Sequence, residues 1–268
     1  MLRDGHIHTP YCPHGSRDSL KSYVEEAINK GFTSMTFTEH APLPKTFTDP
    51  VPDKDSGMEQ QLLESYITKI KEIKKEYQKN IDILLGFEVD YIEGHEPGTR
   101  TFLNEYGSEL DDSILSVHFL KGPSAYHCID FSPESFLAAV DDFGSIEMLY
   151  NTYFATVEKS VSSDLGVYKP ERIGHMSLVR KFHQRFPSPD NWDEPVPKLL
   201  RQIAEKNYQL DYNAAGFFKS LCQESYPAPH IAEQAVELGI PLIYGSDAHI
   251  SNAVGQGFNK INQTLIKG

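Results

Sequence analysis

Histidine and carboxylate residues recur in this sequence at the ends of short apolar segments. The first segment leads into His6 and His8, and the last leads into Asp247 and His249. Side chains two positions apart in an extended segment point the same way, so each pair can bind one ion, and Asp247 with His249 could also bridge two. Nine residues fit the pattern: His6, His8, His14, His40, Glu88, His118, His175, Asp247 and His249.

These side chains predict a metal centre. Imidazole and carboxylate ligands together suit zinc, manganese or iron(II). A closed structural zinc site uses four ligands, so nine candidates indicate two or three divalent ions. A single histidine at the end of a strand is more often a hydrogen-bonded core residue, and it is the repeated pattern that points to metal.

The elements that must position these ligands alternate between strand and helix. We expect strands at 2–6, 32–38, 81–89, 113–119, 172–175, 208–213 and 241–245. We expect helices at 20–30, 59–79, 132–163, 196–206, 228–238 and 257–267. Several strands are almost continuously apolar, which is typical of parallel strands buried on both faces. The pattern predicts a single α/β domain over residues 1–268, a (β/α) barrel, with an open doubly wound sheet as the alternative. In both, the carboxyl ends of the strands converge on one face.

Composition excludes some partners and locations. Lys and Arg number 25 against 38 Asp and Glu, a net charge of −13, which argues against nucleic acid as the main partner. Cys12, Cys128 and Cys222 are odd in number and widely spaced, which indicates a reducing compartment rather than disulfides. The sequence has no secretion signal or membrane-spanning apolar run, so we expect a cytoplasmic protein.

Some neighbouring residues have simpler interpretations. Cys12 could reach a metal, but we expect a small buried side chain there. Glu39 is expected to support a ligand or to be a solvated charge, not to bind metal. The remaining histidines fall in loops or helices and are expected to be surface or structural residues: His95, His127, His183 and His230.

Around the nine residues the sequence resembles the PHP (polymerase and histidinol phosphatase) metallohydrolases, and within them the histidinol-phosphate phosphatases. The matching segments are 4–9 with His14, 37–44, 85–91, 116–119, 173–175 and 245–249, in order along the whole chain. One departure lies after His175, where the family leads us to expect an acidic residue near Ser177.

The resemblance implies a distorted (β/α)7 TIM-like barrel with three divalent ions at the carboxyl ends of the strands. The first ion would be held by His6, His8, Glu88 and Asp247. The second would share Glu88 and be completed by His118 and His175. The third would be held by His14, His40 and His249.

The activity implied is hydrolysis of the phosphomonoester L-histidinol phosphate, a small-molecule substrate from histidine biosynthesis, to L-histidinol and inorganic phosphate. A hydroxide bridging two ions would attack phosphorus. Arg180 would bind the phosphate, because its planar guanidinium matches phosphate oxygens. His40 or Asp247 would protonate the leaving group. Phe119 and Tyr91 are expected to pack in the core rather than contact the substrate.

Two other functions remain open from the sequence. One is a phosphoesterase of the same superfamily acting on another small phosphate or a nucleotide. The other is a non-catalytic metal-binding protein. The oligomeric state cannot be read from the sequence.

Overall fold

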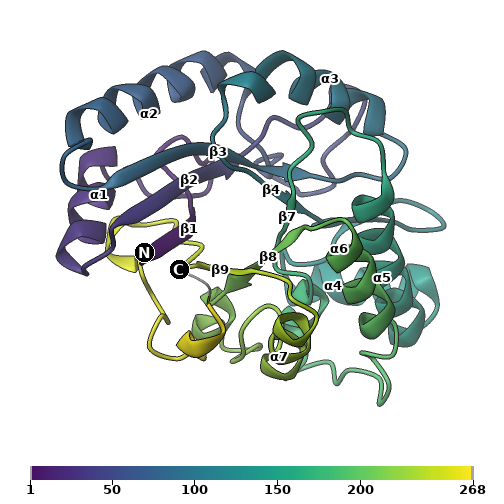
Figure 1. Cartoon of the computed structure of the whole chain (residues 1–268). Helices are drawn as coiled ribbons and strands as arrows, with labels where there is room; N and C mark the ends of the chain where they lie inside the picture. The colour runs from purple at the N-terminus through teal and green to yellow at the C-terminus, as the bar shows by residue number, and fades with distance from the viewer. Residues whose placement is uncertain (1, 267–268) are drawn as a thin grey trace.

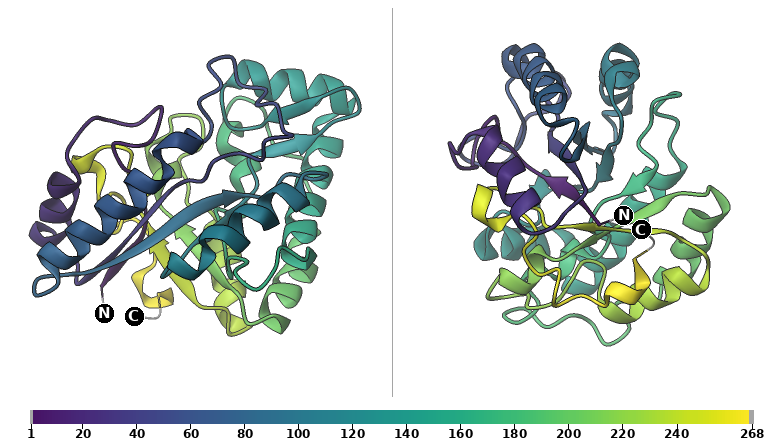
Figure 2. Two further views of the ribbon diagram at one scale, coloured as in Figure 1. Left: turned by 90° about the horizontal axis from the view of Figure 1, so that it is seen from above. Right: turned by 60° about the vertical axis from the view of Figure 1, so that its left-hand side comes forward.

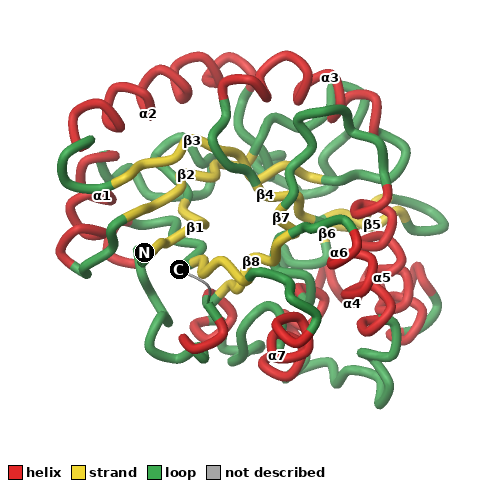
Figure 3. Tube along the Cα trace, viewed as in Figure 1, coloured by secondary structure: helices red, strands yellow, loops and turns green. Residues whose placement is uncertain are grey.

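Seven parallel strands form a barrel at the centre of the molecule, with helices around it (Figures 1 and 3). The computed structural model describes residues 2–266. In spatial order the strands are β1 (Arg3–Ile7), β2 (Ser34–His40), β3 (Asp82–Asp90), β4 (Ile114–Ser116), β7 (Arg172–Ile173), β8 (Gln209–Asn213) and β9 (Leu242–Gly245). All seven predicted strands are therefore present, and the barrel is confirmed over the open sheet.

The barrel closes where the first strand meets the segment after the last. Ile7 and Ala248 form a parallel bridge. The amide of His8 donates to the carbonyl of Ala248 at 3.0 Å, and the amide of Asp247 donates to the carbonyl of His6 at 2.8 Å. Backbone hydrogen bonds thus bring two predicted metal-binding segments together from opposite ends of the chain.

The outer layer consists of helices that join successive strands, as Figure 2 shows from two further directions. They are α1 (Leu20–Asn29), α2 (Leu63–Tyr77), α3 (Glu96–Tyr106), α4 (Pro133–Phe143), α5 (Ile146–Ser162), α6 (Val196–Glu205) and α7 (Pro229–Glu237). Every residue of β2 is buried, as expected for a strand covered on both faces. Among the described helices, none is both long and apolar enough to cross a membrane.

Two expected helices were wrong, and some elements were not predicted. The helix expected over 132–163 is two helices, because Gly144 adopts a left-handed conformation (φ 84°) and Ser145 caps a new helix by accepting from the amide of Met148. The helix expected over 257–267 is absent from its described part, residues 257–266, which contain only a short 3-10 turn, Gln263–Leu265. Residue 267 lies outside the described residues. Helix α3 and the antiparallel pair β5 (Phe119–Lys121) and β6 (Tyr126–Cys128) were not predicted.

Candidate metal centre

The nine predicted ligands lie together at the carboxyl ends of the barrel strands. A cavity of about 510 Å³ opens at this end. Seven of the nine residues line it: His14, His40, Glu88, His118, His175, Asp247 and His249. The other two, His6 and His8, are fully buried beside them. The structure therefore gathers residues from six strand ends into one cluster.

The carboxylate of Glu88 lies at the centre of this cluster. Its Oε2 is 3.3, 3.4 and 3.5 Å from Nδ1 of His40, Nε2 of His6 and Nε2 of His8. Its Oε1 is 2.8 Å from Nε2 of His175. The strand register explains the first contact, because His40 on β2 pairs directly with Glu88 on β3. One carboxylate thus faces ligands from three other strands, β1, β2 and β7.

Strand β4 orients the other side of Glu88. The hydroxyl of Ser116 donates to Oε1 of Glu88 at 2.6 Å, and Nε2 of His118 lies 3.6 Å from the same oxygen. Ser116 is opposite Asp90 in the register of β3 and β4. A carboxylate fixed in this way can bridge two ions, as the sequence resemblance implies.

Asp247 is the second central carboxylate. Its Oδ1 is 3.2 Å from Nε2 of His8 and 3.6 Å from Nδ1 of His249. Its Oδ2 accepts a hydrogen bond from Nδ2 of Asn213 at 3.2 Å. The backbone of Asp247 is left-handed (φ 53°), which is uncommon outside glycine and is concentrated at functional sites. The strained turn directs this side chain into the cluster.

Three buried ring nitrogens support metal binding. Nε2 of His6, Nε2 of His8 and Nδ1 of His40 have no hydrogen-bond partner within the described part of the chain. A buried polar atom left without a partner costs about 1–3 kcal/mol. Each of these nitrogens faces a carboxylate oxygen, so a divalent cation placed between them would satisfy both. The residues present therefore fit the metal ions that the sequence predicts.

The potential ligand atoms fall into compact groups, each within 4.8 Å. One group contains His6, His8 and Asp247, three of the four residues expected at the first ion, and a second contains Glu88, His118 and His175, those expected at the second. A third contains His8, Cys12, His40 and His249, so it has Cys12 where His14 was expected, and a fourth contains His183, Cys222 and Glu224. His14 lies close by, with its ring centroid 5.2 Å from those of His40 and His249 and its Nδ1 3.0 Å from the carbonyl oxygen of Asp55.

Outer carboxylates hold three of the histidines. Nδ1 of His6 lies 2.8 Å from Asp211, Nδ1 of His8 lies 3.2 Å from Glu39, and Nδ1 of His118 lies 2.8 Å from Asp90. Such pairs fix the ring so that the opposite nitrogen faces a metal. Glu39 therefore supports a ligand, which was one of the two roles expected for it. Asp90 and Asp211 were missed, although each lies two positions from a residue already considered, Glu88 or Asn213.

The electrostatics of the cluster favour cations. Burial alone would raise the pKa of Glu88 and Asp247, but positive charge on neighbouring histidines, first of all His6, holds both pKa values well below their usual range. Burial, and then the charge of His8, lowers the pKa of His40 well below its usual value. Ionised carboxylates and a neutral imidazole are the states that bind metal.

The structure does not bring Arg180 to the cavity. Its guanidinium pairs with Glu224, with Nη2 3.1 Å from Oε2, and lies 4.2 Å from the ring of Trp192. The adjacent Lys181 lines the cavity instead, and its Nζ is 3.0 Å from Asp130. Both residues belong to the 3-10 helix Leu178–Phe182, in which successive side chains point in different directions. Arg180 therefore lies outside the cavity lining, contrary to the expectation that it binds the phosphate.

The remaining histidines have other partners, as expected of structural residues. They contact Thr46 (His95), Asp142 (His127), the carbonyl of Cys222 (His183) and Asp193 (His230). Tyr91 is buried and its hydroxyl donates to Glu96 at 2.8 Å. Phe119 is also buried, and part of it lines the cavity.

A barrel with a histidine and carboxylate cluster at the carboxyl ends of its strands is the architecture of a metal-dependent barrel enzyme. The chain belongs to the PHP family. The PHP domain model matches residues 4–215, and a PHP-associated model matches residues 231–267.

Related proteins match nearly the whole chain. The histidinol-phosphatase of Bacillus subtilis is 47% identical over 258 residues, 96% of each protein. A solved structure from Listeria monocytogenes, of a protein proposed to be a histidinol phosphatase, is 40% identical, covers 96% of this chain and 99% of its own, and has a TM-score of 0.92. A histidinol phosphate phosphatase from Lactococcus lactis, solved with zinc, L-histidinol and phosphate, is 18% identical with a TM-score of 0.70 over 99% of this chain and 94% of its own, and shows that the fold is shared.

Proposed function

We propose that this protein is a metal-dependent phosphatase that hydrolyses L-histidinol phosphate to L-histidinol and inorganic phosphate. The observation that carries the substrate is the 47% identity to the Bacillus subtilis histidinol-phosphatase over 96% of both chains. The cluster around Glu88 and Asp247 supplies the chemistry that such a reaction needs. A phosphate monoester hydrolyses extremely slowly in water, so the protein must both activate water and stabilise negative charge.

The nine clustered residues are proposed to bind two to three divalent ions of zinc, iron or manganese. The first ion is assigned to His6, His8, Glu88 and Asp247, and the second to Glu88, His118 and His175. The third is assigned to His40 and His249 with His14 nearby. When bound, such ions lower the pKa of a coordinated water and offset charge on phosphoryl oxygens.

Lys181 is proposed to bind the phosphate from the cavity wall. Burial would lower the pKa of Lys181, but the carboxylate of Asp130 raises it, so the ammonium stays charged at neutral pH. Asp130 holds the ammonium at 3.0 Å, which places a fixed positive charge beside the metal cluster. Lys219 also lines the cavity. Local cations of this kind let a chain of net charge −13 bind an anionic ester.

The leaving alkoxide must gain a proton, and His40 and Asp247 both line the cavity. The dependence on the leaving group separates their roles. Loss of a proton donor slows an alkyl phosphate far more than an aryl phosphate with a weakly basic leaving group. We propose to measure the ratio of the rate on the alkyl phosphate to the rate on the aryl phosphate in His40→Asn and Asp247→Asn. A loss of metal that slows both substrates equally cancels in this ratio. The variant with the larger change in the ratio identifies the donor.

Steady-state kinetics test the whole proposal. Values of kcat/KM should be highest for L-histidinol phosphate, compared with nucleoside monophosphates and a generic aryl phosphate. Activity should disappear on chelation and return when metal is added. Equal rates on all esters would favour a general phosphoesterase of the same family. Bound metal with no hydrolysis of any ester would favour a metal-binding protein without catalysis.

The three free thiols are consistent with a proposed cytoplasmic location.

A further inference from the structure

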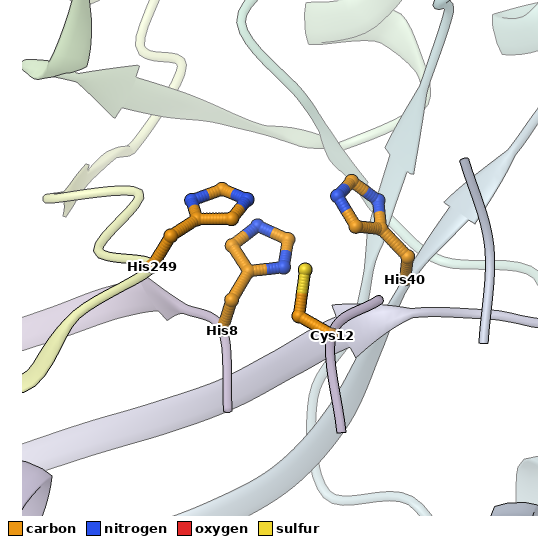
Figure 4. A group of neighbouring side chains, drawn as sticks. All are labelled: His8, Cys12, His40 and His249. Carbon is orange, nitrogen blue, oxygen red and sulfur yellow. The ribbon is translucent and has the colours of Figure 1, made fainter. Parts of the chain in front are cut away.

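The thiol of Cys12 lies among the histidines assigned to the third ion. One potential ligand atom from each of four side chains lies within 4.8 Å of the others: Sγ of Cys12 and a ring nitrogen of His8, His40 and His249. Figure 4 shows the sulfur pointing towards the rings of His8 and His40. Cys12 is completely buried. A buried thiol at this place can be either a packing residue or a ligand.

Two ring nitrogens beside Cys12 indicate that its surroundings are not those of an ordinary packing residue. Nδ1 of His40 and Nε2 of His8 have no hydrogen-bond partner within residues 2–266, and both side chains are more than nine-tenths buried. An ordinary packed core satisfies its polar atoms. Here a soft sulfur donor lies within 4.8 Å of a ring nitrogen of His40 and of His249, which together make a donor set typical of zinc sites.

The backbone holds Cys12 in this position. Its amide donates to the carbonyl of Thr9 at 3.0 Å, and the amide of Ser16 donates to the carbonyl of His249 at 2.8 Å. A Cβ atom at Gly15 would approach Cβ of Cys12 to 2.9 Å, so only glycine allows the loop to pack this closely. The loop therefore fixes the thiol against His249 before any ion binds.

We infer that Cys12 is a thiolate ligand of the third ion, together with His40 and His249. This inference rests on the proposed metal centre and adds a sulfur donor to it. His8 remains with the first ion, because its Nε2 lies 3.2 Å from Asp247. On binding, the S–H bond breaks, a metal–sulfur bond forms and the proton passes to solvent. A thiolate makes the third site prefer zinc over manganese.

Cobalt substitution gives a readout that does not depend on activity. The full-length protein is stripped of metal and reloaded with Co²⁺, and the near-ultraviolet thiolate-to-cobalt charge-transfer band is recorded. The band should appear in the wild type and disappear in Cys12→Ser. It should persist in Cys128→Ser and in Cys222→Ser. In the wild type the thiol of Cys128 donates to Asp130, and Cys222 does not line the cavity. A missing band in the wild type, or a band that survives in Cys12→Ser, overturns the inference.

A second measurement needs no variant. X-ray absorption of the zinc-loaded wild type should show sulfur at about 2.3 Å, whereas nitrogen and oxygen neighbours alone overturn the assignment. If Cys12→Ser folds, its zinc affinity at the weakest site should fall about 10-fold or more. These outcomes are separate from the proposed function. A Cys12→Ser variant with unchanged zinc binding refutes the ligand and leaves the phosphatase standing. If the wild-type protein hydrolyses no ester, the proposed phosphatase activity is refuted. The cobalt charge-transfer band still reports whether Cys12 binds the ion.

Discussion

Nδ1 of His6 lies 2.8 Å from Oδ2 of Asp211, a residue 205 positions further along the chain. The two side chains come from β1 and β8, and both are fully buried. Asp211 also accepts a hydrogen bond from Nδ2 of Asn213 at 3.1 Å. This contact fixes the His6 ring with its unpaired Nε2 towards Glu88 and Asp247. The sixth strand of the barrel thus supports the metal centre without contributing a ligand.

Asp211→Asn should weaken metal binding while the fold persists. The substitution removes the negative charge that makes His6 a stronger ligand, and losses of such supporting carboxylates cost about 10–100-fold in metal affinity or activity. Zinc affinity is measured by competition with a chromogenic chelator, and the metal content per chain is measured after dialysis.

Asp193→Asn provides a matched control for this substitution. Asp193 also pairs with a histidine, His230, at 3.0 Å, but both side chains are more than 40% exposed and lie away from the cavity. Its metal affinity should stay at the wild-type value. Equal losses in the two variants, or none in Asp211→Asn, would mean that His6 does not depend on this contact.

Lys181→Met should raise KM for L-histidinol phosphate more than it lowers kcat. A hydrogen bond to a charged group contributes about 1.5–3 kcal/mol, which corresponds to a change of about 10–100-fold in KM. Arg180→Met is the neighbouring control. It breaks the pair with Glu224 and the contact with Trp192, so it should lower the thermal midpoint and change KM little. The reverse pattern would restore Arg180 as the phosphate-binding residue.

Removal of metal should destabilise the folded protein. Ions that bind only the native state stabilise it by about 4 kcal/mol at 1,000 times their dissociation constant. Without them, the buried Nε2 of His6 and His8 again lack partners. Calorimetry of the protein before and after chelation should show a lower transition temperature, which zinc restores. An unchanged transition would indicate that the cluster does not bind metal tightly.

The sequence was sufficient to predict the barrel and to collect the ligands, because both follow from local patterns. Apolar runs mark the strands, and parallel strands place their carboxyl ends together, so Glu88 and Asp247 could be assigned to one site from the chain alone. Contacts that depend on the direction of a side chain could not be predicted. Arg180 and Lys181 are adjacent cations, and only the 3-10 geometry shows which one faces the cavity.

Other features were missed because their signal is weak in the sequence. Asp211 lies inside a short buried strand with no predicted metal ligand beside it to mark it. Its role arises from a contact with a strand far along the chain. The break between α4 and α5 depends on one residue, Gly144, within an otherwise continuous helical pattern. Cysteine is a residue type that commonly packs in protein cores, so Cys12 did not stand out in the sequence. Only its position close to three histidines indicates a ligand.

Stability above neutral pH should depend on Lys169, far from the metal cluster. Burial, and then the charge of Lys206, lowers the pKa of Lys169 to about 8 from 10.5. Its Nζ donates to the carbonyls of Val161 and Ser163 at 2.8 Å, at the end of α5. Between these two pKa values the unfolded chain binds more protons than the folded protein, so the free energy of unfolding rises with pH. Urea unfolding from pH 7.5 to 10.5 should show the wild type gaining stability relative to Lys169→Met. Because other titrating groups cancel in this difference, a constant difference would refute the assignment.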